Sequence, residues 1–278
     1  METSKHDSAE AQLALAFAQA AVSAGALIMD VYRRDFRMRM KSDSSPVCEA
    51  DERSEELILQ ELAKACPGVP VVAEESVSKG HVPQLERSFL LVDPLDGTRE
   101  FASRNGEFTV NIALVRDGAP ILGALYAPAF GRLWLSAGSA AYACDVAPGE
   151  RVPPLGGMRR IEVRALQGRE PVAAVSRSHL NDETKALMTR LGAQDMRPAG
   201  SAMKFCLIAE GRADVYPRIG PTMEWDIAAG DAVLRAAGGL VTLLDGTPLN
   251  YGRAQQGFAS PDFVAFGDRT QIERLRGL

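Results

Sequence analysis

The segment Leu91-Val-Asp93-Pro-Leu95-Asp96-Gly97-Thr98 decides the fold of the chain around it. The apolar residues Phe89–Val92 predict a buried strand, which we expect to end at Asp93-Pro94 because proline has no N–H for pairing with a neighbouring strand. The pair Asp96-Gly97, taken alone, also fits a tight turn between two strands. Residues 99–107 are not strand-like, which favours a turn that leads out of the sheet.

The acidic and small residues of this segment suit a phosphate site. Asp93 and Asp96 are three residues apart, so their carboxylates can face one another across the turn and hold two metal ions about 4 Å apart. The carbonyl of Leu95 can supply a further oxygen ligand. Gly97 lets the backbone approach an anion closely, and Thr98 can begin a helix whose first amides face a phosphate.

Acidic residues adjoin apolar segments elsewhere in the chain as well. A buried carboxylate without a partner becomes neutral or needs a cation, and several that converge repel one another. Mg²⁺ prefers oxygen ligands and would remove that repulsion. Each acid alone can instead cap a helix or pair with an arginine, but the motif Asp-Pro-x-Asp-Gly-Thr is too specific for this to explain the whole set. The set is Glu74, Asp93, Asp96 and Asp226.

Composition narrows the range of partners. The chain has 278 residues, of which 46% are hydrophobic, enough for a sizeable core, and its formal net charge is −5. It has no basic run interleaved with aromatic residues, so a nucleic-acid duplex is not an expected partner. A small anionic ligand is compatible with this charge because a metal ion can supply positive charge. The four cysteines form no C-x-x-C motif, which is typical of free thiols in a reducing compartment.

The N-terminal sequence bears on location. Residues Met1–Asp7 are polar and lack the basic-then-apolar order of a signal peptide. The stretch Leu13–Met29 is apolar in patches but contains polar residues, so it predicts an amphipathic helix and no transmembrane segment. We therefore expect a cytoplasmic protein, with peripheral attachment to the inner face of the cell membrane left open. A monomer and a homodimer are both compatible with the sequence.

The order of predicted elements indicates an α/β protein built in two halves. Helical patterns cover residues 8–33 and 50–65. The strand patterns that follow residue 107 adjoin one another, which favours a mixed or antiparallel sheet over strict βαβ alternation. Residues 146–160 are rich in proline, glycine and arginine and are the expected boundary. The predicted halves of one compact catalytic unit are residues 1–150, α+β with most metal ligands, and residues 151–278, α/β with Asp226 and the substrate-selecting residues.

Three short motifs resemble the signatures of the inositol monophosphatase superfamily of lithium-sensitive, Mg²⁺-dependent phosphatases. They are Glu74-Glu75, Asp93–Thr98 and Trp225-Asp226. The resemblance extends from about residue 10 to about residue 266 and implies a layered α/β/α/β/α fold with the site between the halves. Within the superfamily the chain is most similar to the bacterial CysQ group of 3′(2′),5′-bisphosphate nucleotidases. The segments that carry this narrower resemblance are Lys41–Asp51, Gly106–Leu114, Ser176–His179, Lys204–Gly211 and Tyr216–Thr222.

The resemblance implies roles for individual residues. Asp51 and Thr98 match the pair that orients and deprotonates the attacking water, and Gly97 and Thr98 match the amides that hold the phosphate. Cys48 stands where the family usually carries threonine, outside the catalytic set, so we expect intact chemistry. The expected ligands of two or three Mg²⁺ ions, which Li⁺ would inhibit, are Glu74, Asp93, the carbonyl of Leu95, Asp96 and Asp226. The substrate-binding set is expected to share Glu74, Leu95, Asp96 and Asp226 with these ligands.

Substrate choice depends on residues in the second half. Inositol monophosphatases that resemble this chain carry a glutamate shortly before the third signature, where it accepts hydrogen bonds from ring hydroxyls. Here the neighbourhood contains Arg218, which suits a second phosphate better than a neutral polyol. Lys204 and His179 lie in segments that resemble the nucleotide-binding side of the CysQ group, and Ser176 and Ser201 can add hydroxyl donors. Each of these residues is also compatible with a solvated surface position.

The predicted reaction is the hydrolysis of adenosine 3′,5′-bisphosphate to AMP and phosphate, with 3′-phosphoadenylyl sulfate as a second substrate. One alternative is an inositol-1-phosphate or fructose-1,6-bisphosphate phosphatase of the same superfamily. A more distant alternative is a non-catalytic protein that senses a phosphate ligand through a metal. Every catalytic position is occupied, which argues against the non-catalytic alternative.

Overall fold

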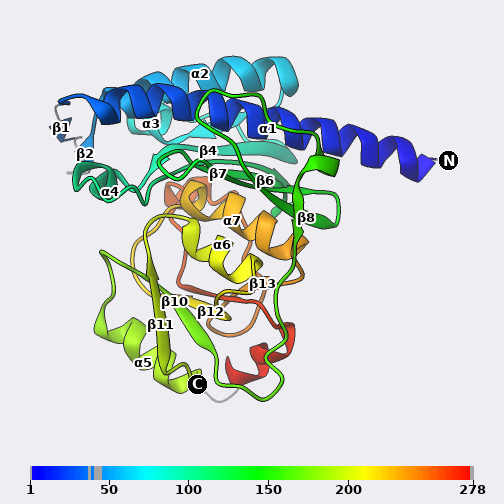
Figure 1. Ribbon diagram of the computed structural model, residues 1–278, viewed down its shortest axis with the longest axis vertical. Helices are drawn as coiled ribbons and strands as arrows, with labels where there is room; N and C mark the ends of the chain where they lie inside the picture. Colours follow the sequence, from blue (N-terminus) through cyan, green and yellow to red (C-terminus); the bar gives the residue numbers. More distant parts are fainter. Residues whose placement is uncertain (1, 37–38, 41–45, 276–278) are drawn as a thin grey trace.

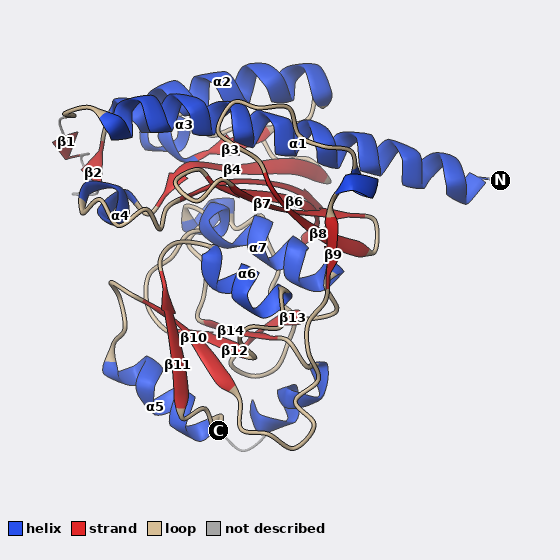
Figure 2. Ribbon diagram, in the orientation of Figure 1, coloured by secondary structure: helices blue, strands red, loops and turns tan. Residues whose placement is uncertain are grey.

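The protein consists of two β-sheets with helices above, between and below them, as Figures 1 and 2 show. The structure is a computed structural model that describes residues 2–36, 39–40 and 46–275. Helices α1 and α2 cover the outer face of the first sheet, α6 and α7 lie between the sheets, and α5 packs on the far face of the second sheet. The predicted layered α/β/α/β/α arrangement is confirmed. The helices are α1 Glu2–Arg33, α2 Glu49–Ala65, α3 Glu74–Ser78, α4 Thr98–Ala102, α5 Asp182–Arg190, α6 Met203–Ala209 and α7 Glu224–Ala236.

The first sheet has seven strands in the order β3-β4-β5-β6-β7-β8-β9. All neighbours in it are antiparallel except β3 and β4, which run parallel with Ala73 opposite Val92. The residues after these two strands therefore emerge at the same edge of the sheet. The strands are β3 Val71–Ala73, β4 Ser88–Asp96, β5 Thr109–Arg116, β6 Ala119–Ala127, β7 Arg132–Ala137, β8 Ala140–Asp145 and β9 Arg159–Ile161.

The second sheet has five strands in the order β11-β10-β12-β14-β13. Strands β10, β11 and β12 are parallel, and β14 runs antiparallel to both of its neighbours. The strands are β10 Val172–Ser176, β11 Asp195–Ala199, β12 Val215–Arg218, β13 Leu240–Leu243 and β14 Phe263–Phe266. A small separate sheet pairs β1 Arg39–Met40 with β2 Pro46–Val47, and the short 3₁₀ helices are η1 Leu155–Gly157, η2 Ala254–Gln256 and η3 Arg269–Leu275.

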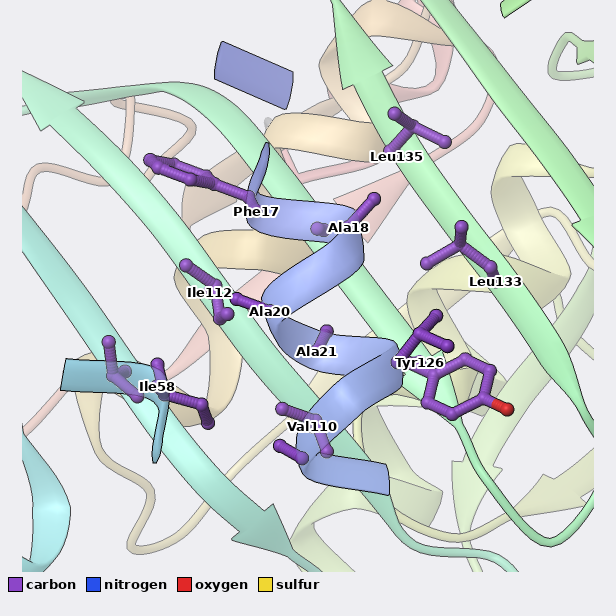
Figure 3. Close-up of a cluster of buried hydrophobic side chains, with 14 of the residues drawn as sticks. Phe17, Ala18, Ala20, Ala21, Ile58, Val110, Ile112, Tyr126, Leu133 and Leu135 are labelled. Carbon is purple, nitrogen blue, oxygen red and sulfur yellow. The ribbon is translucent and has the colours of Figure 1, made fainter. Parts of the chain in front are cut away.

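Helix α1 forms much of the outer core because small residues let it lie close to the first sheet. Phe17, Ala18 and Ala21 are fully buried and face the side chains of Ile112 and Tyr126, as Figure 3 shows. The stretch Ala9–Arg33 is long and apolar enough to cross a membrane by length and composition, and most of its best window is buried inside the molecule. Its apolar residues are therefore accounted for by packing.

Helix α7 is buried on nearly all sides, since it packs between the two sheets. Two glycines permit this close approach. A methyl group on Gly230 would lie 2.4 Å from the ring of Phe205, and one on Gly123 would lie 2.4 Å from the carbonyl oxygen of Ala229. The N-terminal turn of α7, which carries Asp226, is thus fixed against the first sheet.

One prediction about a strand was wrong. Strand β4 does not end at Asp93-Pro94 but continues to Asp96, because the register shifts between Asp93 and Asp96 and the proline lies inside that irregularity. After β13 the chain turns at Asp245-Gly246, and an antiparallel bridge joins Thr242 to Pro248 across this turn.

The division of the chain near residue 150 stays a prediction. Strand β9 comes after that position and completes the first sheet, so the chain passes from the first sheet to the second between residues 162 and 171. Residues 41–45, part of the segment Lys41–Asp51 that supports the narrower resemblance, lie outside the described residues.

Candidate active site

Three carboxylates converge between the first sheet and helix α7. Asp93 and Asp96 lie on β4 around its irregular register, and Asp226 lies in the first turn of α7. One oxygen from each of the three lies within 4.8 Å of one from each of the others. We call these three residues the acidic cluster. The cluster brings together residues that are 133 positions apart in the sequence, as predicted.

Hydrogen bonds orient each carboxylate of the acidic cluster through one of its two oxygens. Asp93 Oδ1 accepts a hydrogen bond from the backbone N–H of Leu95 at 2.9 Å. Asp96 Oδ2 accepts one from the hydroxyl of Ser201 at 2.6 Å, and Asp226 Oδ2 accepts one from the hydroxyl of Thr222 at 2.8 Å. Among the described residues, no hydrogen bond reaches the second oxygen of any of the three. Each carboxylate therefore has a fixed direction and one oxygen free for a ligand.

The electrostatics of the acidic cluster favour a cation. Burial, followed by the charges of Glu74, Asp96 and Asp226, raises the pKa of Asp93 well above its usual value. Burial and the charge of Asp96 raise the pKa of Asp226 to about 7. Burial also raises the pKa of Asp96, although the hydrogen bond from Ser201 and the charge of Lys204 oppose it. These residues fit a hard divalent ion such as Mg²⁺, which takes carboxylate oxygens and would remove the repulsion.

Glu74 lies beside the cluster without lining the same cavity. It is the first residue of α3, directly after β3, and its charge raises the pKa of Asp93 and of Asp226. The carboxylate of Glu55 holds the start of α3, because it accepts hydrogen bonds from the N–H of Glu75 at 2.7 Å and from the hydroxyl of Ser76 at 2.6 Å. This anchoring fixes where Glu74 leaves the strand.

Asp51 is a buried carboxylate in the first turn of α2. Its Oδ2 accepts hydrogen bonds from the backbone N–H of Cys48 at 2.8 Å and from the Cys48 thiol at 3.0 Å. Burial raises the pKa of Asp51 to about 7, although the bonds from Cys48 oppose the shift. Among the described residues, no hydrogen bond joins Asp51 to Thr98, so the water-activating pair stays a prediction. Asp51 can nevertheless change its protonation state near neutral pH.

Gly97 makes the turn between the cluster and helix α4. Its φ of +94° lies in the left-handed region that favours glycine, and a methyl group there would lie 3.3 Å from the carbonyl oxygen of Glu107. Thr98 follows as the first residue of α4, as predicted, although α4 has only five residues. The turn therefore depends on glycine for its backbone conformation as well as for access.

A cavity of about 410 Å³ opens beside the acidic cluster. Asp96, Gly97, Thr98 and Asp226 line one part of it. All of the residues predicted to select the substrate line it as well, namely Ser176, His179, Ser201, Lys204 and Arg218. Asp51, Glu74, Asp93 and Leu95 are not among its lining residues. The cavity therefore has carboxylates of the acidic cluster in one part of its lining and a lysine, an arginine and hydroxyl groups in another.

Lys204 is almost fully buried, with 5% of its surface exposed. Its ammonium donates a hydrogen bond to the carbonyl oxygen of Ser201 and lies 5.2 Å from the centre of the Tyr216 ring. Burial lowers the pKa of Lys204 to about 8, while the charge of Asp96 opposes the shift. Arg218 donates to the carbonyl oxygen of Pro221, and its Nε is buried without a partner. Hydrogen bonds to the backbone orient both cations, of which Lys204 is buried and Arg218 partly exposed.

Arg99, which was not among the predicted site residues, lines the same cavity. Its guanidinium lies 3.0 Å from Nε2 of His179, so the contact joins the first half of the chain to the second. Burial and the charges of Arg218 and Arg99 lower the pKa of His179, which keeps the ring neutral at pH 7. In the sequence, the one indication that Arg99 belongs to the site was its position directly after Thr98. Its contact with His179 could be predicted only from the way in which the two halves pack together.

A buried acidic cluster that fits divalent cations, beside a cavity lined by oriented lysine and arginine, defines a metal-dependent enzyme of phosphate compounds. The model of the family described as "Inositol monophosphatase family" matches residues 9–271. The chain belongs to this family, and the expected resemblance is confirmed.

Individual relatives agree with this assignment. The chain is 42% identical to the 3′(2′),5′-bisphosphate nucleotidase CysQ of Escherichia coli K12, over 88% of this chain and 96% of the relative. The crystal structure of CysQ from Bacteroides thetaiotaomicron is similar with a TM-score of 0.76 and 36% identity, over 91% of this chain and 96% of that one. The inositol monophosphatase of Anabaena sp. PCC 7120 gives a TM-score of 0.69 and 25% identity, over 94% and 92%.

Proposed function

We propose that this protein is a Mg²⁺-dependent phosphomonoesterase that hydrolyses the 3′-phosphate of adenosine 3′,5′-bisphosphate, giving AMP and phosphate. It takes 3′-phosphoadenylyl sulfate as a second substrate. One observation carries the proposal. Two oriented cations, Lys204 and Arg218, line the same cavity as Asp96 and Asp226, so one cavity offers a cation site for the reacting phosphate and positive side chains for a second one. The similarity to bisphosphate nucleotidases supports the same substrate class.

The acidic cluster, with Glu74 and the carbonyl of Leu95, would hold two or three Mg²⁺ ions. When bound, the ions neutralise charge on the phosphoryl oxygens and on the leaving oxygen and activate water. The amides of Gly97 and Thr98 orient the phosphate. The hydroxyl of Thr98 orients the attacking water, and the carboxylate of Asp51 accepts its proton. A group whose pKa is about 7 suits this role at neutral pH.

The products follow from a balanced displacement at phosphorus. The water oxygen forms a bond to the 3′-phosphorus, the bond from phosphorus to O3′ breaks, and O3′ takes up a proton as the 3′-hydroxyl. The second phosphate stays on the nucleoside and is held by Lys204 and Arg218, with Ser176 and His179 as further donors, whereas the hydroxyl of Ser201 is used by Asp96. A neutral polyol would offer the buried Lys204 and the partly buried Arg218 no second anionic group, so these cations would contribute less to its binding.

A small panel of substrates tests the proposal. Phosphate release is measured with adenosine 3′,5′-bisphosphate, inositol 1-phosphate and fructose 1,6-bisphosphate, with Mg²⁺, with Mg²⁺ plus Li⁺, and with EDTA. We expect the highest kcat/KM for the bisphosphonucleotide, inhibition by Li⁺ and no turnover in EDTA. A preference for either of the other substrates would assign the chain to another activity of the family. An inactive protein that binds the nucleotide tightly in Mg²⁺ would indicate a sensor.

We also propose that the enzyme works in the cytoplasm. All four cysteines are free and buried, which suits a reducing compartment. Sedimentation of the purified protein with and without liposomes decides whether it attaches to a membrane surface. The same measurement without liposomes distinguishes a monomer from a homodimer.

A further inference from the structure

Glu107 connects the two halves of the chain beside the cavity. It lies in the loop between α4 and β5, and its carboxylate accepts hydrogen bonds from Arg177 and Gly200 of the second half. Glu107 Oε2 accepts hydrogen bonds from Nε of Arg177 at 2.6 Å and from the backbone N–H of Gly200 at 2.7 Å. Glu107 Oε1 accepts a second bond from Arg177 at 2.6 Å. We call this arrangement the Glu107 clamp.

The residue that follows Gly200 belongs to the active site. The hydroxyl of Ser201 donates a hydrogen bond to Asp96 in the acidic cluster, and its carbonyl oxygen accepts one from the ammonium of Lys204. Ser201 has a φ of +52°, in the left-handed region that a serine adopts only at an energetic cost. A conformation of this kind persists when the surrounding contacts hold it. The Glu107 clamp acts on the residue directly before it.

The contact at Gly200 is also sterically tight. A methyl group on Gly200 would lie 2.5 Å from the carbonyl oxygen of Glu107 and 2.7 Å from its Cβ. Any side chain at this position would push the loop of Glu107 and the strand end of β11 apart. The closeness of the two backbones therefore sets the separation between the halves at this point.

Glu107 is held as a charged group. Burial raises its pKa, but the hydrogen bonds from Arg177 and Gly200 outweigh burial and lower the pKa overall. Its side chain is 16% exposed, and it does not line the cavity. Glu107 therefore does not contact a ligand in the cavity, and its hydrogen-bonded route to the site runs through Gly200 and Ser201, beside a weaker charge interaction with Lys204.

We propose that Glu107 is a positioning residue that determines specificity: through Gly200 and Ser201 it sets the separation between Lys204 and the acidic cluster that a 3′,5′-bisphosphate requires. The inference rests on the proposed function. Loosening the clamp would let the ammonium of Lys204 move relative to the reacting phosphate. The enzyme would then lose binding of the second phosphate more than it loses chemistry at the first.

The chain contains a matched control for this clamp. Asp214 accepts two hydrogen bonds from Arg164, at 2.8 and 2.6 Å, and one from the backbone N–H of Val172 at 2.8 Å. The bonding pattern is that of Glu107, but Val172 and Asp214 lie at the amino ends of β10 and β12, whereas the cavity lies at their carboxyl ends. Asp214→Asn removes the same kind of ion pair without touching the cavity.

The test compares Glu107→Gln with Asp214→Asn on two nucleotides that differ by one phosphate. We measure kcat and KM for adenosine 3′,5′-bisphosphate and for adenosine 3′-monophosphate, together with the melting temperature. Glu107→Gln should raise KM for the bisphosphate about tenfold, a loss that corresponds to one weakened charge-assisted contact. Its kcat should change less than about threefold, and KM for the monophosphate should stay near the wild-type value. Asp214→Asn should lower the melting temperature and leave both KM values unchanged.

Three outcomes would contradict the inference. One is a Glu107→Gln enzyme with wild-type preference for the bisphosphate, which would make the clamp merely structural. Another is an equal loss on both nucleotides, which would place the effect on catalysis. Gly200→Ala provides a second test of the same contact, and a wild-type KM in that variant would also overturn it. If the wild-type enzyme itself prefers inositol 1-phosphate, the proposed function fails first and the inference fails with it.

Discussion

Asp214 and the acidic cluster are carboxylates in very different surroundings. In the second half, Asp214 is 1% exposed and accepts hydrogen bonds from Nε and from one terminal nitrogen of Arg164. In the acidic cluster, Asp93 is equally buried, yet among the described residues no lysine or arginine lies within ion-pair distance of any member. The pKa values follow this difference. The bonds from Arg164 and Val172 outweigh burial and lower the pKa of Asp214, whereas burial and mutual repulsion raise those of the cluster.

Burial of a carboxylate alone therefore does not distinguish the candidate active site from a structural ion pair. At Asp214 the fold supplies an arginine, whereas the three carboxylates between the sheets have no such partner among the described residues and would suit a cation from solution. An arginine there would fill the position that an ion and a phosphate must share. The measurements below test this division, from the largest expected effect to the smallest.

The largest effect is expected at Asp51, a buried carboxylate of a third kind that neither pairs with an arginine nor belongs to the acidic cluster. Asp51→Asn cannot accept a proton, so kcat should fall by about 10²–10⁴-fold. Thr98→Ala should lower kcat strongly as well, because the water loses its orientation. Both variants should keep wild-type circular dichroism. Near-normal turnover in either variant would remove that residue from the catalytic pair.

The next effect contrasts Asp93 with Asp214 in metal-free protein. Asp214→Asn leaves the partly exposed Arg164 without its charged partner and weakens the bond from the N–H of Val172, so the free energy of unfolding should fall by about 1–3 kcal/mol. Asp93→Asn keeps an acceptor for the N–H of Leu95 and removes one repelling charge. Its free energy of unfolding in EDTA should equal or exceed the wild-type value, while its activity in Mg²⁺ is lost. Urea unfolding in EDTA measures the free energy of unfolding of both variants. A loss of stability in both would show that Asp93 and Asp214 do not differ in the way proposed.

Much of this site could be predicted because its residues lie in short, recognisable sequence motifs. The motif from Asp93 to Thr98 and the acid after Trp225 carry their chemistry in their neighbours, and Lys204 and Arg218 lie in similarly recognisable segments. The residues Asp96–Thr98, Asp226, Lys204 and Arg218 do line one cavity, whereas Asp93 lies outside its lining. Strand β4 was misjudged at Pro94, because a register irregularity that absorbs a proline depends on the partner strand.

Contacts between the halves could not be predicted in the same way. The partners Arg99 and His179 are 80 residues apart, and Glu107 and Arg177 are 70 residues apart. Neither pair belongs to a periodic pattern, because each forms only where the first half of the chain meets the second. Such pairs are determined by the docking of the sheets, and the sequence around each residue contains no signal for its partner.

A smaller effect separates the two groups of carboxylates by pH. The pKa of Asp226 is about 7 in the folded protein, and 3.8 is its ordinary value, so the folded protein binds a proton at this carboxylate more tightly than the unfolded chain does. The stability that this proton contributes is fully present below about pH 4 and is lost as the pH rises through 7. Asp214 has a lowered pKa and stays charged across this range. The melting temperature in EDTA should therefore fall between pH 4 and pH 7.

Added Mg²⁺ supplies the check on this pH dependence. The ion competes with protons for the same oxygens, so it should raise the melting temperature more at pH 8 than at pH 5. Asp214→Asn should show the same dependence from a lower starting value. A melting temperature in EDTA that rises steadily from pH 4 to pH 7 would show that the acidic cluster does not dominate.

The smallest effect concerns the thiol of Cys48, a weak hydrogen-bond donor to the carboxylate of Asp51. Serine is a stronger donor and a better residue at the start of a helix, so Cys48→Ser should stabilise the protein by about 0.5–1 kcal/mol. A stronger hydrogen bond to the carboxylate should also lower the pKa of Asp51, which moves the acid limb of the kcat profile to lower pH by less than about one unit. Cys144→Ser, on β8, should leave the profile unchanged. Identical acid limbs in Cys48→Ser and wild type would show that the group titrating in kcat is not the carboxylate that this thiol contacts.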